Sequence, residues 1–158
     1  MNFTKIALDV IDTEANALLD MKNRIDDSFI KACTLMQHCQ GKIIVSGIGK
    51  SGLIGKKIAA TLSSTGTPAI FLHPTEASHG DFGMLQAHDL ILAISHSGNT
   101  EELCKLFPYI QAKKVPIIAM TSNSKSLLAK NATIVLNYGN AKEACPLGLA
   151  PVSYTHLT

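Results

Sequence analysis

Hydroxyl side chains gather around one glycine directly after an apolar run of the sequence. Ser95, Ser97 and Thr100 flank Gly98, and the run before them, residues 90–95, is typical of a buried strand. Three hydroxyl groups and the unpaired N–H groups at the start of a following helix can bind one anion together. This pattern predicts a turn that holds a phosphate group.

A purely structural explanation of the same stretch is a helix cap. Ser97 or Asn99 could cap the following helix, with Glu102 as the partner in a capping box. Such a cap accounts for one hydroxyl group, whereas the stretch carries three. We therefore prefer the anion-binding interpretation and keep the cap as its alternative.

A second turn has glycines at the spacing of a dinucleotide-binding loop: Gly47, Gly49 and Gly52. An NAD site would need an acidic residue at the end of the second strand, where the sequence has His73 instead. A Walker A loop is excluded because Ile44 stands where its first glycine would be. Two uses remain. In one, Gly49 and Ser51 bring a backbone N–H and a hydroxyl to an anion at a helix start; in the other, the turn is merely tight.

The elements that position these turns alternate along the chain. Continuous apolar runs predict strands covered on both faces, at residues 42–47, 68–73, 90–95, 116–121 and 132–137. Helical segments separate them, at residues 51–64, 75–80, 99–113 and 124–130, and one or two amphipathic helices precede them at residues 3–39. The alternation predicts an α/β fold, a three-layer αβα sandwich with a five-stranded parallel sheet. Ligands bind such sheets at the carboxyl ends of the strands, where both turns fall.

Composition and charge narrow the class of protein. With 158 residues, 46% of them hydrophobic and 16% charged, the chain fits one domain with its own core. A formal net charge of +2 from scattered basic residues predicts no nucleic-acid partner, and no apolar run approaches the length of a membrane span. The four cysteines form no CxxC pair, so neither a structural zinc site nor a disulfide scaffold is indicated. Acidic residues interrupt the first apolar stretch, which excludes a signal peptide there. We expect a cytoplasmic protein.

Three stretches of the chain carry a family resemblance. They read "SGIGKSGLIGKKIAATLSSTGTPAIFLHPTEASHGDFGML", "ISHSGNTEEL" and "KEACPLGLAP". From about residue 5 to Pro151 the chain resembles the arabinose-5-phosphate isomerases of the sugar isomerase (SIS) domain superfamily. Many sugar-phosphate binders share the Ser-x-Ser-Gly part, whereas "HPTEASHGDFGM" and "KEACPLGLAP" are more specific.

The resemblance implies a SIS fold, which is flavodoxin-like, and a homo-oligomer, usually a tetramer. It implies an aldose–ketose isomerase that interconverts D-ribulose 5-phosphate and D-arabinose 5-phosphate and supplies Kdo for lipopolysaccharide. Carried over by position, the phosphate-loop residues are Ser51, Ser95, Ser97 and Thr100. The polar active-site positions are Lys50, His79, Glu102 and Glu143.

These polar side chains suit a reaction that passes through an enediol. We expect Glu102 to be the base that moves the carbon-bound proton and Lys50 to stabilise the developing oxyanion. His79 would serve the substrate oxygens as an acid or orienting group, and Glu143 would be a second carboxylate or position hydroxyls. Isomerisation needs no redox cofactor, so none is expected, and nothing in the residue spacing requires a metal.

Each of these residues also has a structural alternative. Glu102 could stabilise a helix start, Lys50 could be a solvated loop lysine, His79 could cap or pack, and Glu143 could lie on the surface. Three other histidines are expected to be secondary: His73 and His96 near the site, and His88 on a surface turn.

The resemblance ends at Pro151, after which the sequence reads "VSYTHLT". The family continues there with a long helix and a further active-site histidine, often supplied across a subunit boundary, and many members append CBS modules. His156 does not match that histidine. We expect an incomplete SIS domain over residues 1–151 and an unrelated tail at 152–158. An apolar face left exposed would weaken folding, assembly and turnover.

Two other functions remain open. SIS domains also serve as sugar-phosphate sensors in transcription regulators, but a sensor needs an attached helix-turn-helix, and none is evident before residue 40. A sensor would also have no use for the four polar positions together. Another SIS isomerase, acting on a phosphoheptose or a hexulose phosphate, is the nearer rival, and the two specific stretches argue against it.

Overall fold

The structure, a computed structural model, describes residues 2–145. Two helices come first, α1 (Phe3–Lys22) and α2 (Asp27–Gln37). The strands are β1 (Ile43–Ser46), β2 (Ala69–Phe71), β3 (Leu90–Ile94), β4 (Ile117–Thr121) and β5 (Ile134–Asn137). The helices between them are α3 (Lys50–Ser64), α4 (Pro74–Ser78), the 3₁₀ helix η1 (Asp81–Met84), α5 (Glu101–Cys104), α6 (Phe107–Ala112) and α7 (Leu127–Asn131). Each of these strands lies within its predicted run.

The strands form one parallel sheet in the order β2-β1-β3-β4-β5. The chain runs from β1 out to β2 and then returns to the other side of β1 with β3, so the strand order reverses between β1 and β3. Ser46, the last residue of β1, pairs with Ala93, one residue before the end of β3. The two carboxyl ends are therefore level, at the crevice where ligands bind in open parallel sheets.

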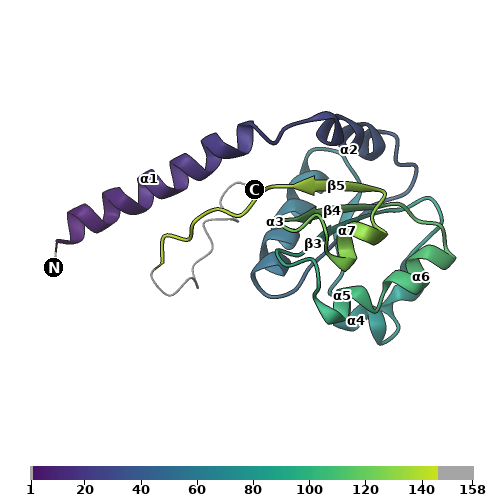
Figure 1. Cartoon of the computed structure of the whole chain (residues 1–158). Coiled ribbons are helices and arrows are strands. Elements are labelled where there is room, and N and C mark those ends of the chain that lie inside the picture. The colour runs from purple at the N-terminus through teal and green to yellow at the C-terminus, as the bar shows by residue number, and fades with distance from the viewer. Residues whose placement is uncertain (1, 146–158) are drawn as a thin grey trace.

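Helices cover both faces of the sheet. Side chains alternate along each strand, so each strand sends apolar side chains to both faces. Ile43 and Val45 pack on the side covered by α2 and α3, while Ile44 packs on the side covered by α4 to α7. Figure 1 shows α2 on the opposite side of the sheet from α4, α5 and α6. Burial on both faces explains why the apolar runs are continuous. The predicted three-layer sandwich is confirmed.

The helical segment predicted at residues 99–113 is confirmed, and it is divided into two short helices, α5 and α6. Pro108 lies in the first turn of α6, has no N–H to donate and would clash with the Cys104 carbonyl in a continuous helix. Helix α5 therefore ends at Cys104 after 4 residues. So short a helix has little macrodipole, and an anion beside it must be held by hydroxyl and N–H groups themselves.

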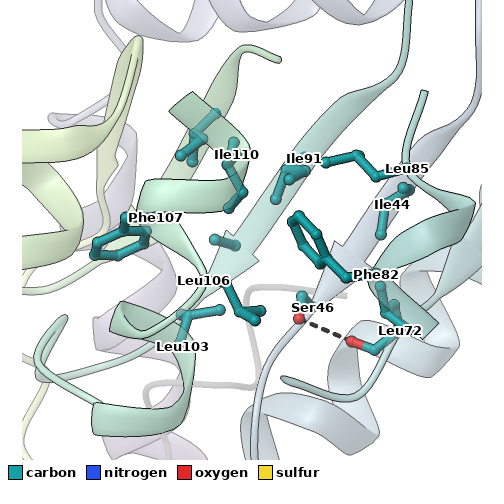
Figure 2. A pocket seen from close by; sticks show the side chains of 12 residues that line it. Ile44, Ser46, Leu72, Phe82, Leu85, Ile91, Leu103, Leu106, Phe107 and Ile110 are labelled. Carbon is teal, nitrogen blue, oxygen red and sulfur yellow. Dashed lines mark hydrogen bonds between the residues drawn. The ribbon is translucent and has the colours of Figure 1, made fainter. Parts of the chain in front are cut away.

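A small cavity lies in the core next to α5 and α6. Figure 2 shows apolar side chains around it, including Phe82, Leu85 and Ile91. Its volume is about 10 Å³, which is room for about one water molecule. At its wall, the Ser46 hydroxyl donates a 2.8 Å hydrogen bond to the Leu72 carbonyl. The cavity is a packing gap of the core and too small for a sugar phosphate.

Helix α1 extends away from the sheet and its covering helices (Figure 1). Ala17 is the buried residue of this helix. Large apolar side chains along it are exposed: Phe3, Ile6, Leu8, Ile11, Leu18 and Leu19. A row of exposed apolar side chains is typical of a site where another chain packs.

Within residues 2–145, no helix combines the length and the apolar character that crossing a membrane requires. The predicted domain end at Pro151 and the predicted tail at 152–158, with His156, lie outside the described residues.

Candidate functional site

The turn after β3 folds its hydroxyl groups into a small network. Ser95 is only 3% exposed, and its Oγ lies 2.8 Å from the Thr100 Oγ1. The same Ser95 Oγ accepts a 3.1 Å hydrogen bond from the Gly98 N–H. Gly98 has a φ of +66°, which only glycine adopts without strain, so the turn closes tightly on itself. Ser97 lies on the exposed side of this turn.

The alternative interpretation of this stretch as a cap by Ser97 or Asn99 is wrong. Thr100 is the N-cap residue of α5, and its side chain makes no capping hydrogen bond. The Asn99 Oδ1 instead accepts a 2.9 Å hydrogen bond from the N–H of Leu127, the first residue of α7. The Ser97 Oγ accepts a 3.2 Å bond from the Asn99 N–H within the turn. Neither side chain caps α5.

The glycine turn after β1 packs directly against the end of β3. A Cβ atom at Gly47 would lie 3.0 Å from the Ile94 carbonyl oxygen and 3.1 Å from the Ser51 backbone. One at Gly52 would lie 2.8 Å from the Gly47 carbonyl oxygen. The glycines thus let the start of α3 approach both strands, which explains their dinucleotide-like spacing without a dinucleotide.

Gly49 and Ser51 lie at the amino end of α3. Gly49 is the N-cap residue with a φ of +59° and no side-chain cap, and Ser51 is 6% exposed. Because α3 has 15 residues, its first N–H groups and its macrodipole favour a bound anion. The contacts of Gly47 place this helix start beside the turn after β3. The two predicted phosphate turns are therefore neighbours at the strand-order reversal.

Three of the four polar candidates lie on elements around these turns. Lys50 is the exposed first residue of α3, and Glu102 is exposed on α5. His79 is the exposed C-cap residue of α4, and α4 packs against α5. The neighbouring Glu101 is bound to Lys105, 2.7 Å away. That hydrogen bond and the charge of Lys105 lower the pKa of Glu101.

Glu143 is placed differently. It is half-buried on the segment that follows β5, the edge strand farthest from β2. Figure 1 shows this segment leaving the edge of the sheet. The part of Glu143 in the site stays a prediction.

The other histidines have contacts of their own. His73 is the N-cap residue of α4, where its Nδ1 accepts a 3.3 Å bond from the Thr75 N–H. The His88 carbonyl accepts a 2.9 Å bond from Gly41. His96 contacts Tyr138 and Ser122, two residues that the sequence analysis missed. Ser122 directly follows the apolar run of β4, the same signal that marked Ser95.

Residues 2–145 contain no group of three or more histidine, cysteine, aspartate or glutamate side chains placed to bind a metal ion.

Comparisons with known proteins place these features in context. The SIS domain model matches residues 36–158. The probable arabinose 5-phosphate isomerase of Haemophilus influenzae is 48% identical over the whole chain, which covers 47% of that protein. Arabinose 5-phosphate isomerase KdsD of Francisella tularensis is 50% identical over 96% of the chain, which again covers 47% of it. The chain thus spans about half the length of these curated relatives.

A solved structure shares the fold over most of its length. The structure of the E. coli CFT073 protein c3406 in complex with arabinose 5-phosphate superposes with a TM-score of 0.93 at 36% sequence identity. The match covers 98% of this chain and 85% of that one.

Proposed function

This chain belongs to the SIS domain family, and from that premise we propose that it binds a sugar phosphate at the ends of β1 and β3. We further propose that it, or a longer protein that contains it, interconverts D-ribulose 5-phosphate and D-arabinose 5-phosphate. The observation that carries the proposal is the pair of adjacent turns, one rich in glycine and one rich in hydroxyl groups, at the strand-order reversal. The names of its curated relatives support the choice of sugar.

The phosphate of the sugar would bind between these two turns. The start of α3 contributes backbone N–H groups, the Ser51 hydroxyl and the positive end of a helix dipole. The turn after β3 contributes Ser95, Ser97 and Thr100. A doubly charged ester is well matched by many neutral donors, because each N–H or O–H that binds an anion forms a stronger hydrogen bond than a neutral pair does.

The isomerisation would proceed by proton transfer within the substrate. From the ketose, Glu102 removes a proton from C1 and the electron pair forms the C1–C2 double bond of an enediolate. The same proton returns to C2, while a proton moves from the oxygen on C1 to the oxygen on C2. Lys50 would stabilise the enediolate oxygen and His79 would serve the oxygen protons. Glu143 would act as a second carboxylate or orient the hydroxyl groups.

The reaction only relocates hydrogen, so it needs no redox cofactor. We propose that the protein works in the cytoplasm as a homo-oligomer, with a tetramer as the expected form. We also propose that its product supplies Kdo for lipopolysaccharide.

The proposal can be tested with ribulose 5-phosphate and NMR detection of arabinose 5-phosphate. The assay uses the chain alone and the chain joined to the part of the H. influenzae relative that the match does not span. Formation of arabinose 5-phosphate by either protein supports the isomerase. Tight binding of the sugar phosphate without turnover by both would favour the sensor, and a product other than arabinose 5-phosphate would favour a different SIS isomerase.

A further inference from the structure

His96 ties the backbone of the turn after β3 to the end of the next strand, β4. The His96 carbonyl accepts hydrogen bonds from the Ser122 N–H at 3.2 Å, from the Ser122 Oγ at 2.8 Å and from the Thr121 Oγ1 at 3.1 Å. A carbonyl oxygen has two lone pairs, so three donors more than occupy it. This concentration of donors holds the peptide group between His96 and Ser97 in one position.

The ring of His96 is also held by residues that follow β4 and β5. Its Nδ1 lies 3.2 Å from the hydroxyl of Tyr138, and its Nε2 lies 3.4 Å from the Ser122 Oγ. Tyr138 is 7% exposed, and the two ring centroids are 5.9 Å apart. Because the one O–H of Ser122 is donated to the His96 carbonyl, the Ser122 Oγ can only accept from the ring Nε2–H. With the proton on Nε2, the Nδ1 can accept from the Tyr138 hydroxyl. The ends of β4 and β5 therefore meet at His96.

Other contacts secure the rest of the turn to the segment between β4 and α7. The Gly98 carbonyl accepts a 2.9 Å hydrogen bond from the Leu128 N–H, and Gly98 lies against Ser126 so closely that a Cβ atom would overlap its Oγ. Asn99 bonds to Leu127 as described above. The turn is thus supported along its length from one side.

We propose that His96, Ser122 and Tyr138 are positioning residues that keep the turn after β3 in the shape that receives the phosphate. The proposal rests on the function proposed above. These residues act through the flanking Ser95 and Ser97, and no contact of their own with the substrate is required. The physical reason is preorganisation: a turn that is already ordered loses less conformational entropy when it binds its ligand.

The test measures the affinity of the chain for inorganic phosphate and for arabinose 5-phosphate by isothermal titration calorimetry, well below the unfolding temperature. Ser122→Ala removes a hydroxyl that contacts both the carbonyl and the ring of His96. We expect it to weaken both affinities about 3- to 10-fold, the range for loss of a hydrogen bond. Ser122→Thr, which keeps a hydroxyl, should restore most of the affinity.

The matched control is Ser124→Ala. Ser124 lies in the same segment, but its Oγ accepts a 2.6 Å bond from Asn137 rather than contacting His96. This variant should bind as the unaltered chain does. Tyr138→Phe provides a second test and should weaken binding, with Tyr109→Phe at an exposed position of α6 as its control.

A purely structural role would lower the unfolding temperature and leave the affinity of the folded protein unchanged. Equal affinities for Ser122→Ala, Tyr138→Phe and the unaltered chain would overturn this proposal and leave the proposed function standing. Failure of the unaltered chain to bind either ligand would overturn both.

Discussion

At the residue scale, the two neighbouring glutamates on α5, Glu101 and Glu102, differ in their contacts. Glu101 is paired with Lys105 by a 2.7 Å contact one helical turn away. Glu102 lies next to it, on the helix that follows the turn with Ser95 and Ser97. A base must be within reach of a carbon-bound proton, and its carboxylate should not already be held by a cation. Glu102 therefore remains our candidate for the base.

Replacing Glu102 with glutamine should abolish turnover and leave binding intact. We expect kcat for isomerisation to fall at least about 100-fold, because the amide cannot accept the proton. The dissociation constant of arabinose 5-phosphate should change by less than about 2-fold, since the role belongs to the transition state. Steady-state kinetics and calorimetry measure the two quantities.

Glu101→Gln is the matched control for this substitution. It removes a charge from the same turn of α5, so a general electrostatic effect would lower kcat in both variants. Retention of normal kcat by Glu102→Gln would show that another group is the base.

At the element scale, the turn after β3 depends on the absence of a side chain at Gly98. Its φ of +66° is unfavourable for other residues, and a Cβ atom would overlap Ser126 in the segment before α7. We expect Gly98→Ala to lower the free energy of unfolding by about 2–4 kcal/mol, from backbone strain and steric overlap together. Thermal unfolding followed by circular dichroism measures the loss.

Gly83→Ala is the control for this prediction. A Cβ atom at Gly83, in η1, meets no heavy atom within 4 Å, and its φ is not in the left-handed region. Its effect should be within about 0.5 kcal/mol. Equal stability of the Gly98 and Gly83 variants would show that the turn has room to rearrange.

A largely buried ion pair lies at the amino ends of β1 and β3, opposite the proposed site. Asp89 is 2% exposed and lies 2.7 Å from the Lys42 Nζ, and it also accepts hydrogen bonds from the N–H groups of Lys42 and Gln86. Burial by itself raises the pKa of Asp89, but the bonds from Lys42 and Gln86 outweigh it and lower the pKa below its usual value. The charged form is therefore favoured in the folded chain, and it joins the starts of β1 and β3.

This lowered pKa predicts the direction of a pH effect. Asp89 contributes its full stabilisation above the pKa of an unfolded aspartate, about 3.9, and loses it as the pH falls through the lower folded value. Asp89→Asn should destabilise the chain by about 2–4 kcal/mol at pH 7, because an amide group would then face the donors. The variant should also lose less stability than the unaltered chain when the pH falls from about 5 to about 3, the range around that pKa. Urea unfolding at several pH values tests both expectations.

The exposed ion pair on α5 serves as the comparison. Glu101→Gln breaks a pair that faces solvent, so its unfolding midpoint should match that of the unaltered chain. A larger effect at Glu101 than at Asp89 would contradict the role given to the buried pair.

At the scale of the whole molecule, α1 is the feature that a single chain does not explain. This helix of 20 residues exposes apolar side chains along its length and extends from the sheet (Figure 1). Helices gain most of their stability from packing an apolar face, so an extended helix of this kind is best stabilised by another chain. The feature supports the proposed homo-oligomer.

Charged residues on α1 should therefore weaken assembly. In the variant Leu8→Glu with Ile11→Glu, we expect the dissociation constant of the oligomer to rise at least about 10-fold, because burying a carboxylate in an apolar contact is costly. Analytical ultracentrifugation over a range of concentrations measures it. Leu127→Glu, an equally apolar exposed position on α7, is the control. Unchanged assembly of the α1 variant would exclude this helix from the interface.

Local sequence features determined where the strands and the two turns of the proposed site lie along the chain. Each strand could be found because burial on both faces leaves a continuous apolar run. Each proposed phosphate turn could be found because glycines and hydroxyl groups directly follow such a run. Pro108 also marks the break between α5 and α6 in the sequence.

The tertiary structure alone decided which of these segments meet. The strand order brings β3 beside β1 and β4, and this order is set by long-range packing that no local pattern encodes. For the same reason the sequence could not predict that Asn99 would bond to α7, or that His96 would contact Tyr138, 42 residues farther along the chain. Residue types and spacing identify the groups that can do chemistry, whereas the fold determines which of them lie together.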